Sequence, residues 1–416
     1  MSNKDALNAI FGSGFSRGYV LGSELLLLLI TTTWMTPSDR GVYIAGFALL
    51  KTVTIICSLS FGQIAIHHIS EKHHSSVGGV GASLLIGCIL FPAVALLGLY
   101  AYGSISDEFR RTYVSPFLTL LAIGLPIFVL EVYFYAFLTA LGRLNTGNAA
   151  IVVGKTLAWG CVLILGLVKG GLNANEVLAS LLSGQLVIVL GYSLGVISEF
   201  RQRAIHLVIE WKTFLGMLRK SIRLHPSIIG SIIFGGIDVL IAFKLAGAKS
   251  ASEYQIAMQL LSALSILPFA IAQFGYKLVS QLGARNAWLR FQAILYKTFS
   301  LHCVLAVFSV GLVWVAAHYL FNEQYINVST LYMLLIAGAP GLFFSLVMAP
   351  FWIGFGYFST TSMLTIATGA LMLPLSYAMT MHYDVKGTAI TFIIGQVLSV
   401  VINGLFIKHL RRTHHV

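Results

Sequence analysis

Long apolar runs alternate with short polar connections along the whole chain. A helix that crosses a membrane needs about 20 predominantly apolar residues, and about twelve runs of that length are present. They lie near residues 13–34, 43–66, 80–103, 114–139, 149–168, 176–197, 226–246, 254–275, 293–317, 327–353, 361–381 and 387–407. Because the runs are uniformly apolar and lack the alternation of a membrane β-barrel strand, they predict helices.

The composition agrees with this pattern. Hydrophobic residues make up 57% of the 416 residues, charged residues make up 10%, and the mean hydropathy is +0.88. These values predict an all-α integral membrane protein. The first run holds Arg17 and Glu24 and lacks a small-residue cleavage pattern, so we expect it to remain as a helix. The four cysteines fall inside apolar runs, at spacings unlike a metal site or a disulfide framework. No cofactor is predicted.

The basic residues of the connections predict the orientation of the helices. With an even number of spans, both termini and alternate connections lie on one side, which carries fifteen Lys and Arg against six on the other. Because cytoplasmic loops carry the excess of basic residues, the sequence predicts a multi-pass protein with both termini in the cytoplasm. This solvated basic face explains most of the net charge of +12 without a nucleic-acid partner.

The longest connection, residues 198–225, predicts an amphipathic helix. Apolar residues recur there at intervals of three and four, with Arg and Lys around them. The apolar face consists of Val208, Trp211, Leu215, Leu218 and Ile222. Such a helix is expected to lie in the cytoplasmic membrane interface. A linker that joins two bundles and rests on anionic lipid is a simpler interpretation than specific substrate recognition.

An internal repeat divides the chain. The matched residues are Tyr43 and Tyr254 at a shift of 211, Pro126 and Pro340 at a shift of 214, and Gln185 and Gln396 at a shift of 211. Each repeat holds an even number of spans, so the two copies enter the membrane in the same direction. The repeat therefore predicts two six-helix bundles, residues 1–197 and 226–416, related by a pseudo-two-fold axis along the membrane normal, with a cavity between them.

Two motifs carry a resemblance to a known superfamily. They are DRGVYIAGFALLKTVTIICSLSFGQIAIH, which starts at residue 39, and GGIDVLIAFKLAGAKSASEYQIAMQLLSAL, which starts at residue 235. With twelve spans and a cytoplasmic link at the midpoint, the chain resembles the multidrug, oligosaccharidyl-lipid and polysaccharide exporter (MOP) superfamily. Within it, the chain resembles the bacterial O-antigen and polysaccharide flippases. The resemblance implies the MATE-like fold of that superfamily.

The resemblance also implies a function. A flippase of this type is a transporter, not an enzyme, and moves undecaprenyl-diphosphate-linked oligosaccharide from the cytoplasmic to the periplasmic leaflet of the bacterial inner membrane by alternating access. Membrane lipids, a polysaccharide polymerase and chain-length proteins are its implied partners. A cation-coupled multidrug exporter of the same fold is an alternative. A membrane glycosyltransferase or polymerase is disfavoured, because the external connections are each about ten residues or shorter and leave little room for a catalytic site.

Ionisable residues inside apolar spans are costly and therefore candidates for function. The cations are Arg17, Lys51, Lys155, Lys244 and Lys297, and the carboxylates are Glu24, Glu131 and Asp238. The excess of two positive charges favours an anionic substrate such as a diphosphate, because Lys serves as a point charge for phosphate. The candidate substrate-binding cations are Lys51, Lys155, Arg17 and Lys244, with Lys51 the strongest because it lies too deep to reach the interface easily. Lys244 lies close to the external end of its span and could instead extend to the interface.

The carboxylates have two interpretations. Glu24 and Lys51 flank the first external turn at similar depth, and Glu131 and Lys155 flank a cytoplasmic turn in the same way, so each couple could be a structural ion pair. Asp238 has no cation opposite it, and Gln255 and Gln259 are its nearest predicted polar neighbours. Glu24, Glu131 and Asp238 could also bind a coupling H⁺ or Na⁺, since burial raises the pKa of an acid.

Prolines inside the spans have a mechanical interpretation. Proline frees backbone carbonyls and bends a membrane helix, which is tolerated where the helix lines a cavity or moves during gating. Pro126 and Pro340 occupy matching places in the two repeats, so they are the candidate kink residues.

Overall fold

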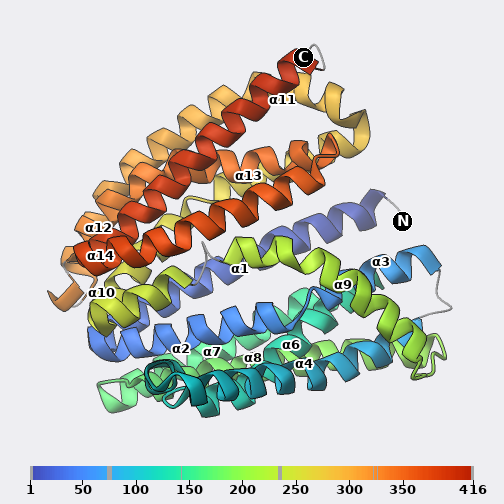
Figure 1. The fold of residues 1–416 in the computed structure, drawn as a ribbon, viewed down its shortest axis with the longest axis horizontal. Helices are drawn as coiled ribbons and strands as arrows, with labels where there is room; N and C mark the ends of the chain where they lie inside the picture. The colour runs from blue at the N-terminus through green and yellow to red at the C-terminus, as the bar shows by residue number, and fades with distance from the viewer. Residues whose placement is uncertain are drawn as a thin grey trace. The chain divides into compact units, whose positions relative to one another are not determined.

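The computed structural model describes residues 3–72, 77–141, 143–232, 237–321, 323–325 and 327–413. These residues are helical almost throughout, and no β-strand occurs among them. The chain divides into two compact units, Met1–Ile232 and Ile233–Val416. In Figure 1 the first unit runs from blue to green and the second from yellow to red. The predicted all-α class is confirmed.

The first unit contains α1 (Asn3–Trp34), α2 (Pro37–Cys57), α3 (Phe61–Lys72), α4 (Val77–Ile105), α5 (Asp107–Phe109), η2 (Arg110–Val114), α6 (Leu118–Ala140), α7 (Leu144–Lys169), α8 (Ala174–Gln202) and α9 (Trp211–Ile232). The predicted run 43–66 is split between α2 and α3. At the break, Leu59 and Ser60 have φ values of 50° and 58°, a conformation that costs a non-glycine residue roughly 1–2 kcal/mol. Neighbouring helices hold the break: Tyr133 donates to the Ser58 carbonyl at 2.9 Å, and Ser60 shares a 3.1 Å hydrogen bond with His225.

Helices α7 and α8 pack against each other more extensively than any other helix pair of the first unit. Gly170 takes a left-handed conformation at the C-terminus of α7, and Asn173 forms a capping box with Glu176 at the start of α8. Glycine lets the two backbones approach: a Cβ built on Gly154 would lie 2.5 Å from the carbonyl oxygen of Gly184. Small residues allow the same close packing between membrane helices in general.

The second unit contains α10 (Asp238–Ala263), α11 (Ile266–Tyr319), η4 (Glu323–Tyr325), α12 (Asn327–Leu335), η5 (Ile336–Gly338), α13 (Ala339–Gly354) and α14 (Phe358–Thr413). Two of these helices contain a break, at Gly247 in α10 and at Asp384 in α14. Helix α10 also meets the first part of α11 at a bend of 44°. The core of this unit includes Trp288, Phe291 and Phe351, which pack ring against ring.

The helices fit the predicted membrane spans. Among the described residues, eight helices are long and apolar enough to cross a membrane, or nine if the bent pair of α10 and α11 is one span. The last candidate, Ser359–Arg412, covers two predicted runs that lie on either side of Asp384. Residues 18–34 form a shorter apolar helix. The helix pattern is consistent with twelve spans, and that number stays a prediction.

Helix α9 lies in the segment that was predicted to be amphipathic. It packs on α3 and α4 through a buried face that includes Phe214 and Met217, and Phe214 meets Phe61 edge to face. Trp211, Leu215 and Ile222, which belong to the predicted apolar face, are exposed. Its placement in the membrane interface remains a prediction.

Candidate functional site

The first unit brings four of the predicted charged residues together. Glu24 lies on α1, Lys51 on α2, Glu131 on α6 and Lys155 on α7. Lys51 interacts electrostatically with the other three, and Glu131 interacts with both lysines. Helix packing explains the convergence, because α1 contacts α2 and α7, and α2 contacts α6. We call these four residues the charge cluster.

No direct ion pair holds the charge cluster together. Among the residues that the structure describes, none of the four takes part in an ion pair of 4.0 Å or less. The predicted couples, Glu24 with Lys51 and Glu131 with Lys155, are therefore neighbours within one group of charges and not isolated pairs. The formal charge of the cluster is zero.

Lys51 is the most accessible member of the charge cluster. Its side chain is exposed, whereas Glu24, Glu131 and Lys155 are half-buried. The Lys51 ammonium lies 4.6 Å from the centroid of the Phe47 ring, a cation–π contact. A charge inside a membrane span almost always faces the protein interior or a water-filled cavity. The cluster thus offers ammonium donors at a polar surface within the apolar spans.

Gln185 on α8 adds a polar group beside the charge cluster. Its amide interacts with the Glu131 carboxylate, yet its buried Nε2 makes no hydrogen bond of good geometry. The sequence indicated Gln185 only as a match within the repeat. Its position beside Glu131 depends on the packing of α6 against α8, which no spacing along the chain reveals.

The second unit holds a separate polar site around Asp238. The hydroxyl of Tyr254 donates to Asp238 Oδ2 at 2.7 Å, and the Val239 backbone N–H donates to Oδ1 at 2.9 Å. Asp238 and Tyr254 line a cavity of about 20 Å³, together with Ser376, Thr388 and Thr391 of α14. We call these five residues the hydroxyl pocket. The prediction named Gln255 and Gln259 as the nearest polar groups, whereas the structure supplies the adjacent Tyr254 as the hydrogen-bond partner.

The hydroxyl pocket has the size and the donors for one small occupant. A cavity of about 10–15 Å³ or more can hold one water molecule. The Ser376 hydroxyl is buried and makes no hydrogen bond, and Thr380 and Thr388 share a hydrogen bond of 2.8 Å beside it. In the described part of the chain, no group of three or more His, Cys, Asp or Glu is placed to bind a metal ion. One carboxylate among neutral oxygens suits a proton or a monovalent cation.

The remaining predicted site residues belong neither to the charge cluster nor to the hydroxyl pocket. Lys244 is half-buried on α10, with its ammonium 5.8 Å from the centroid of the Tyr377 ring. Arg17 is part of α1, but its side chain lies outside the described residues. Pro126 lies inside the uninterrupted helix α6, whereas Pro340 lies at the start of α13, directly after the 3₁₀ turn η5.

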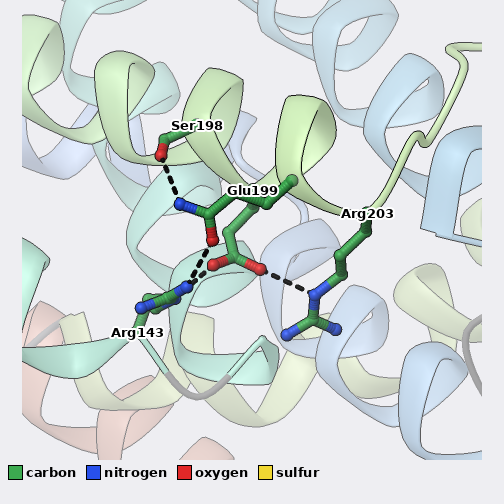
Figure 2. A network of polar contacts seen from close by, with 5 residues as sticks. Arg143, Ser198, Glu199 and Arg203 are labelled. Atoms are coloured by element: carbon green, nitrogen blue, oxygen red, sulfur yellow. Dashed lines mark hydrogen bonds and ion pairs between the residues drawn. The ribbon is translucent and has the colours of Figure 1, made fainter.

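A third polar group joins the turn between α6 and α7 to the end of α8. Figure 2 shows Glu199 between the guanidinium groups of Arg143 and Arg203. Arg143 also donates to Gln202 at 2.8 Å. Glu199 is almost fully buried, while the Arg143 side chain is 48% exposed. The sequence indicated both arginines only as part of the basic cytoplasmic side.

No family model matches the chain, and no curated protein sequence matches it significantly. Solved structures nonetheless match it over almost its whole length. The lipid II flippase MurJ, in an inward closed conformation, matches with a TM-score of 0.73 and 12% identity, covering 97% of this chain and 87% of that one. A multidrug resistance MATE family transporter of the MOP superfamily, in an inward-facing conformation, matches with a TM-score of 0.70 and 14% identity, covering 95% and 96%.

A third structure comes from Pyrococcus furiosus and is a MOP superfamily transporter. It matches with a TM-score of 0.60 and 14% identity, covering 97% of this chain and 94% of that one. Its description states that a binding pocket of reverse polarity suggests a different function for that protein. Likenesses at 12–14% identity show the fold, and the predicted MATE-like fold is confirmed.

Proposed function

We propose that this chain is a flippase that moves a lipid-linked oligosaccharide with a diphosphate headgroup between the leaflets of a membrane. The observation that supports it most directly is the exposed Lys51 residue inside an apolar helix, with Lys155 close by. Within the described ranges, neither ammonium forms an ion pair with a carboxylate. The substrate class is undecaprenyl-diphosphate-linked oligosaccharide, such as an O-antigen unit, moved from the cytoplasmic to the periplasmic leaflet by alternating access.

The chemistry of the charge cluster suits this substrate. A diphosphate that enters a low-dielectric interior loses its hydration and needs cations to replace it. Lys51 and Lys155 supply two point charges, and lysine ammonium groups bind phosphate oxygens. Glu24 and Glu131 balance the charges of the two lysines in the absence of substrate, because opposite charges close together attract each other.

The comparisons support transport but not one substrate. The MurJ structure is that of a lipid II flippase, and the MATE structure is that of a multidrug resistance transporter, and this chain matches both over nearly its whole length. A multidrug exporter is therefore the second candidate function. The charge cluster holds both signs of charge, so the residues that transport depends on distinguish the two functions: an anionic headgroup would depend on Lys51 and Lys155, and a cationic drug on Glu24 and Glu131.

The hydroxyl pocket supports ion coupling in either case. An Asp238 carboxylate that meets only neutral donors gains electrostatic stabilisation from a bound cation. We assign the coupling H⁺ or Na⁺ to this pocket, and the substrate headgroup to the charge cluster.

Complementation of a flippase-deficient bacterial strain tests the function, scored by surface polysaccharide and normalised to membrane protein level. Lys51→Arg is expected to keep appreciable activity because the charge remains. Lys51→Gln is expected to lose about 90% of it, the effect of one charge-assisted contact worth about 1.4 kcal/mol. Ser262→Gln is the matched control, because Ser262 is the exposed counterpart of Lys51 at the repeat shift of 211.

Two results would redirect this proposal. Recovery of activity in the double variant Lys51→Gln with Glu24→Gln would make Lys51 a structural partner of Glu24, because removing both charges leaves neither one buried alone. The wild-type protein could also be expressed in a drug-sensitive strain. If it confers resistance to cationic dyes there but does not restore polysaccharide in the flippase-deficient strain, the protein is a multidrug exporter.

A further inference from the structure

A groove of about 580 Å³ runs between α7 and α8, and no residue of the charge cluster lines it. Ala150 and Gly191 form its floor, where a Cβ built on Gly191 would lie 2.7 Å from the Ala150 Cβ. Val153, Leu190 and Leu194 form its walls, and all three are exposed. A groove of this size falls within the range of about 300–1,000 Å³ for small-molecule sites. On two membrane spans an exposed apolar groove suits a hydrocarbon chain better than a water-soluble ligand, because burying apolar surface is favourable.

One end of the groove is polar and positively charged. Arg143, Ser198, Glu199 and Gln202 line it there, and Figure 2 shows how Glu199 lies between Arg143 and Arg203. Two guanidinium groups against one carboxylate leave a net charge of +1 at this end. Arg143 uses Nε for Glu199 and Nη2 for Gln202, and because its side chain is half-exposed, its remaining N–H groups are the donors for an anion. Arginine favours phosphate because its planar fork can donate two parallel hydrogen bonds.

We propose that this groove binds one anionic phospholipid, with its phosphate at Arg143 and one acyl chain between α7 and α8. The length of the groove fits one leaflet. The lining covers ten residues from Arg143 to Val153 and fifteen from Val187 to Gln202, about 15–22 Å along a helix, which is enough to cross half of the hydrocarbon thickness of about 30 Å. The lipid belongs to the leaflet that contains the turn between α6 and α7, which the basic residues predict to be cytoplasmic.

Native mass spectrometry of the whole purified protein tests this site, with dioleoylphosphatidylglycerol and dioleoylphosphatidylcholine as probes. One phosphatidylglycerol is expected to bind about tenfold more tightly than phosphatidylcholine, and Arg143→Gln is expected to abolish that preference. Arg110→Gln is the matched control: Arg110 is 49% exposed, close to the 48% of Arg143, and it also pairs with a carboxylate. Equal binding of the two lipids to the wild type would overturn the proposal.

A second variant keeps the test independent of the Arg143 network. Ala149 is exposed and lines the groove, so Ala149→Trp fills it and is expected to lower retention of both lipids. Val168→Trp, at an exposed position of α7 outside the groove, is expected to leave retention unchanged. If Ala149→Trp instead converts a dimer to a monomer with lipid retention unchanged, the groove holds a second copy of the chain and the proposal is wrong. Neither readout depends on transport, so the result stands apart from that for the proposed function.

Discussion

The two units repeat one sequence pattern but differ in where they place charge. In the first unit, Lys51 and Glu131 belong to a cluster of four ionisable side chains from four helices. At the repeat shifts of 211 and 214, their counterparts in the second unit are Ser262 and Ser345, which are both exposed. The second unit instead places the Asp238 carboxylate beside a small cavity. The same framework therefore carries two kinds of polar site.

One arrangement is common to both units. Tyr254 donates a hydrogen bond to Asp238, from the second predicted span of its unit to the first. Its counterpart Tyr43 interacts electrostatically with Glu24, again between the second span and the first. The difference lies in the other neighbours: Lys51 interacts with Glu24, whereas Asp238 also accepts from the Val239 backbone N–H. We infer that a carboxylate among lysines helps to hold an anionic headgroup, while a carboxylate among hydroxyls can gain and lose a cation.

Removal of the Asp238 charge is expected to have the largest effect. Asp238→Asn should lower ion-driven transport about a hundredfold, which corresponds to about 2.7 kcal/mol and lies in the range for hydrogen bonds to charged groups. Transport of a labelled lipid-linked substrate in liposomes, under an imposed Na⁺ or pH gradient, measures it. Tyr254→Phe keeps the carboxylate and should retain most of the activity. Full gradient-driven transport by Asp238→Asn would remove the coupling ion from this pocket.

The glycine contacts are expected to matter in both units. In Gly154→Ala the new Cβ would meet the Gly184 carbonyl oxygen at 2.5 Å, and in Gly341→Ala it would meet the Gln396 Cβ at 2.6 Å. Overpacking of this kind costs about 1–3 kcal/mol, so each variant should lower the free energy of unfolding in detergent by about 2 kcal/mol. Gly160→Ala, with no atom within 4 Å of its Cβ, is the control. Equal stability of Gly154→Ala and Gly160→Ala would contradict this packing.

Substitution of Lys155 is expected to lower transport less than substitution of Asp238. Lys155→Gln should lower flipping about tenfold, or about 1.4 kcal/mol, because Lys51 still contacts the headgroup. Lys169→Gln on the same helix is the control, since Lys169 pairs with Glu176 outside the charge cluster. The measurement is the initial flipping rate at several substrate concentrations. A Lys155→Gln rate equal to that of Lys169→Gln would limit the headgroup site to Lys51.

The sequence predicts the helices well because length and uniform hydropathy are enough to identify a membrane span. It also predicts that Lys51 lies near Glu24, since a hairpin brings residues at equal distance from a turn to equal depth. The break at Leu59 and Ser60 could not be predicted, because neither residue is glycine and the strained backbone is stabilised by Tyr133 and His225 from distant segments.

The polar sites were harder to predict than the helices. Serine and threonine are poor signals in a membrane helix because they often bond to their own backbone, as Thr380 does to the Ser376 carbonyl. Their approach to Asp238 depends on the contact of α10 with α14, more than a hundred residues further along the chain. The contact between Arg143 and Glu199 could not be predicted for a similar reason. The count of basic residues in the connections places Arg143 in a loop but does not identify the carboxylate that it contacts.

The smallest expected effect concerns the break within the second span of each unit. In the first unit, the Tyr133 hydroxyl donates to the Ser58 carbonyl, which also accepts from the Phe61 N–H. At the shift of 214, the counterpart of Tyr133 is the buried Val347, which cannot donate, so Tyr133→Phe makes the two units more alike. Because one acceptor bond of Ser58 remains, the variant should lose only about 1 kcal/mol of unfolding free energy.

Hydrogen exchange of the α3 amides is the sharper measurement of this change. If Tyr133 fixes the break, the amides of residues 61–64 should exchange faster in Tyr133→Phe, while those of α7 stay as protected as in the wild type. Tyr135→Phe is the control, because Tyr135 lies on the same helix with an exposed side chain. Unchanged exchange in α3 would mean that the Ser60 and His225 hydrogen bond alone holds the break. The break in the first unit would then not depend on the hydroxyl that distinguishes Tyr133 from its counterpart Val347.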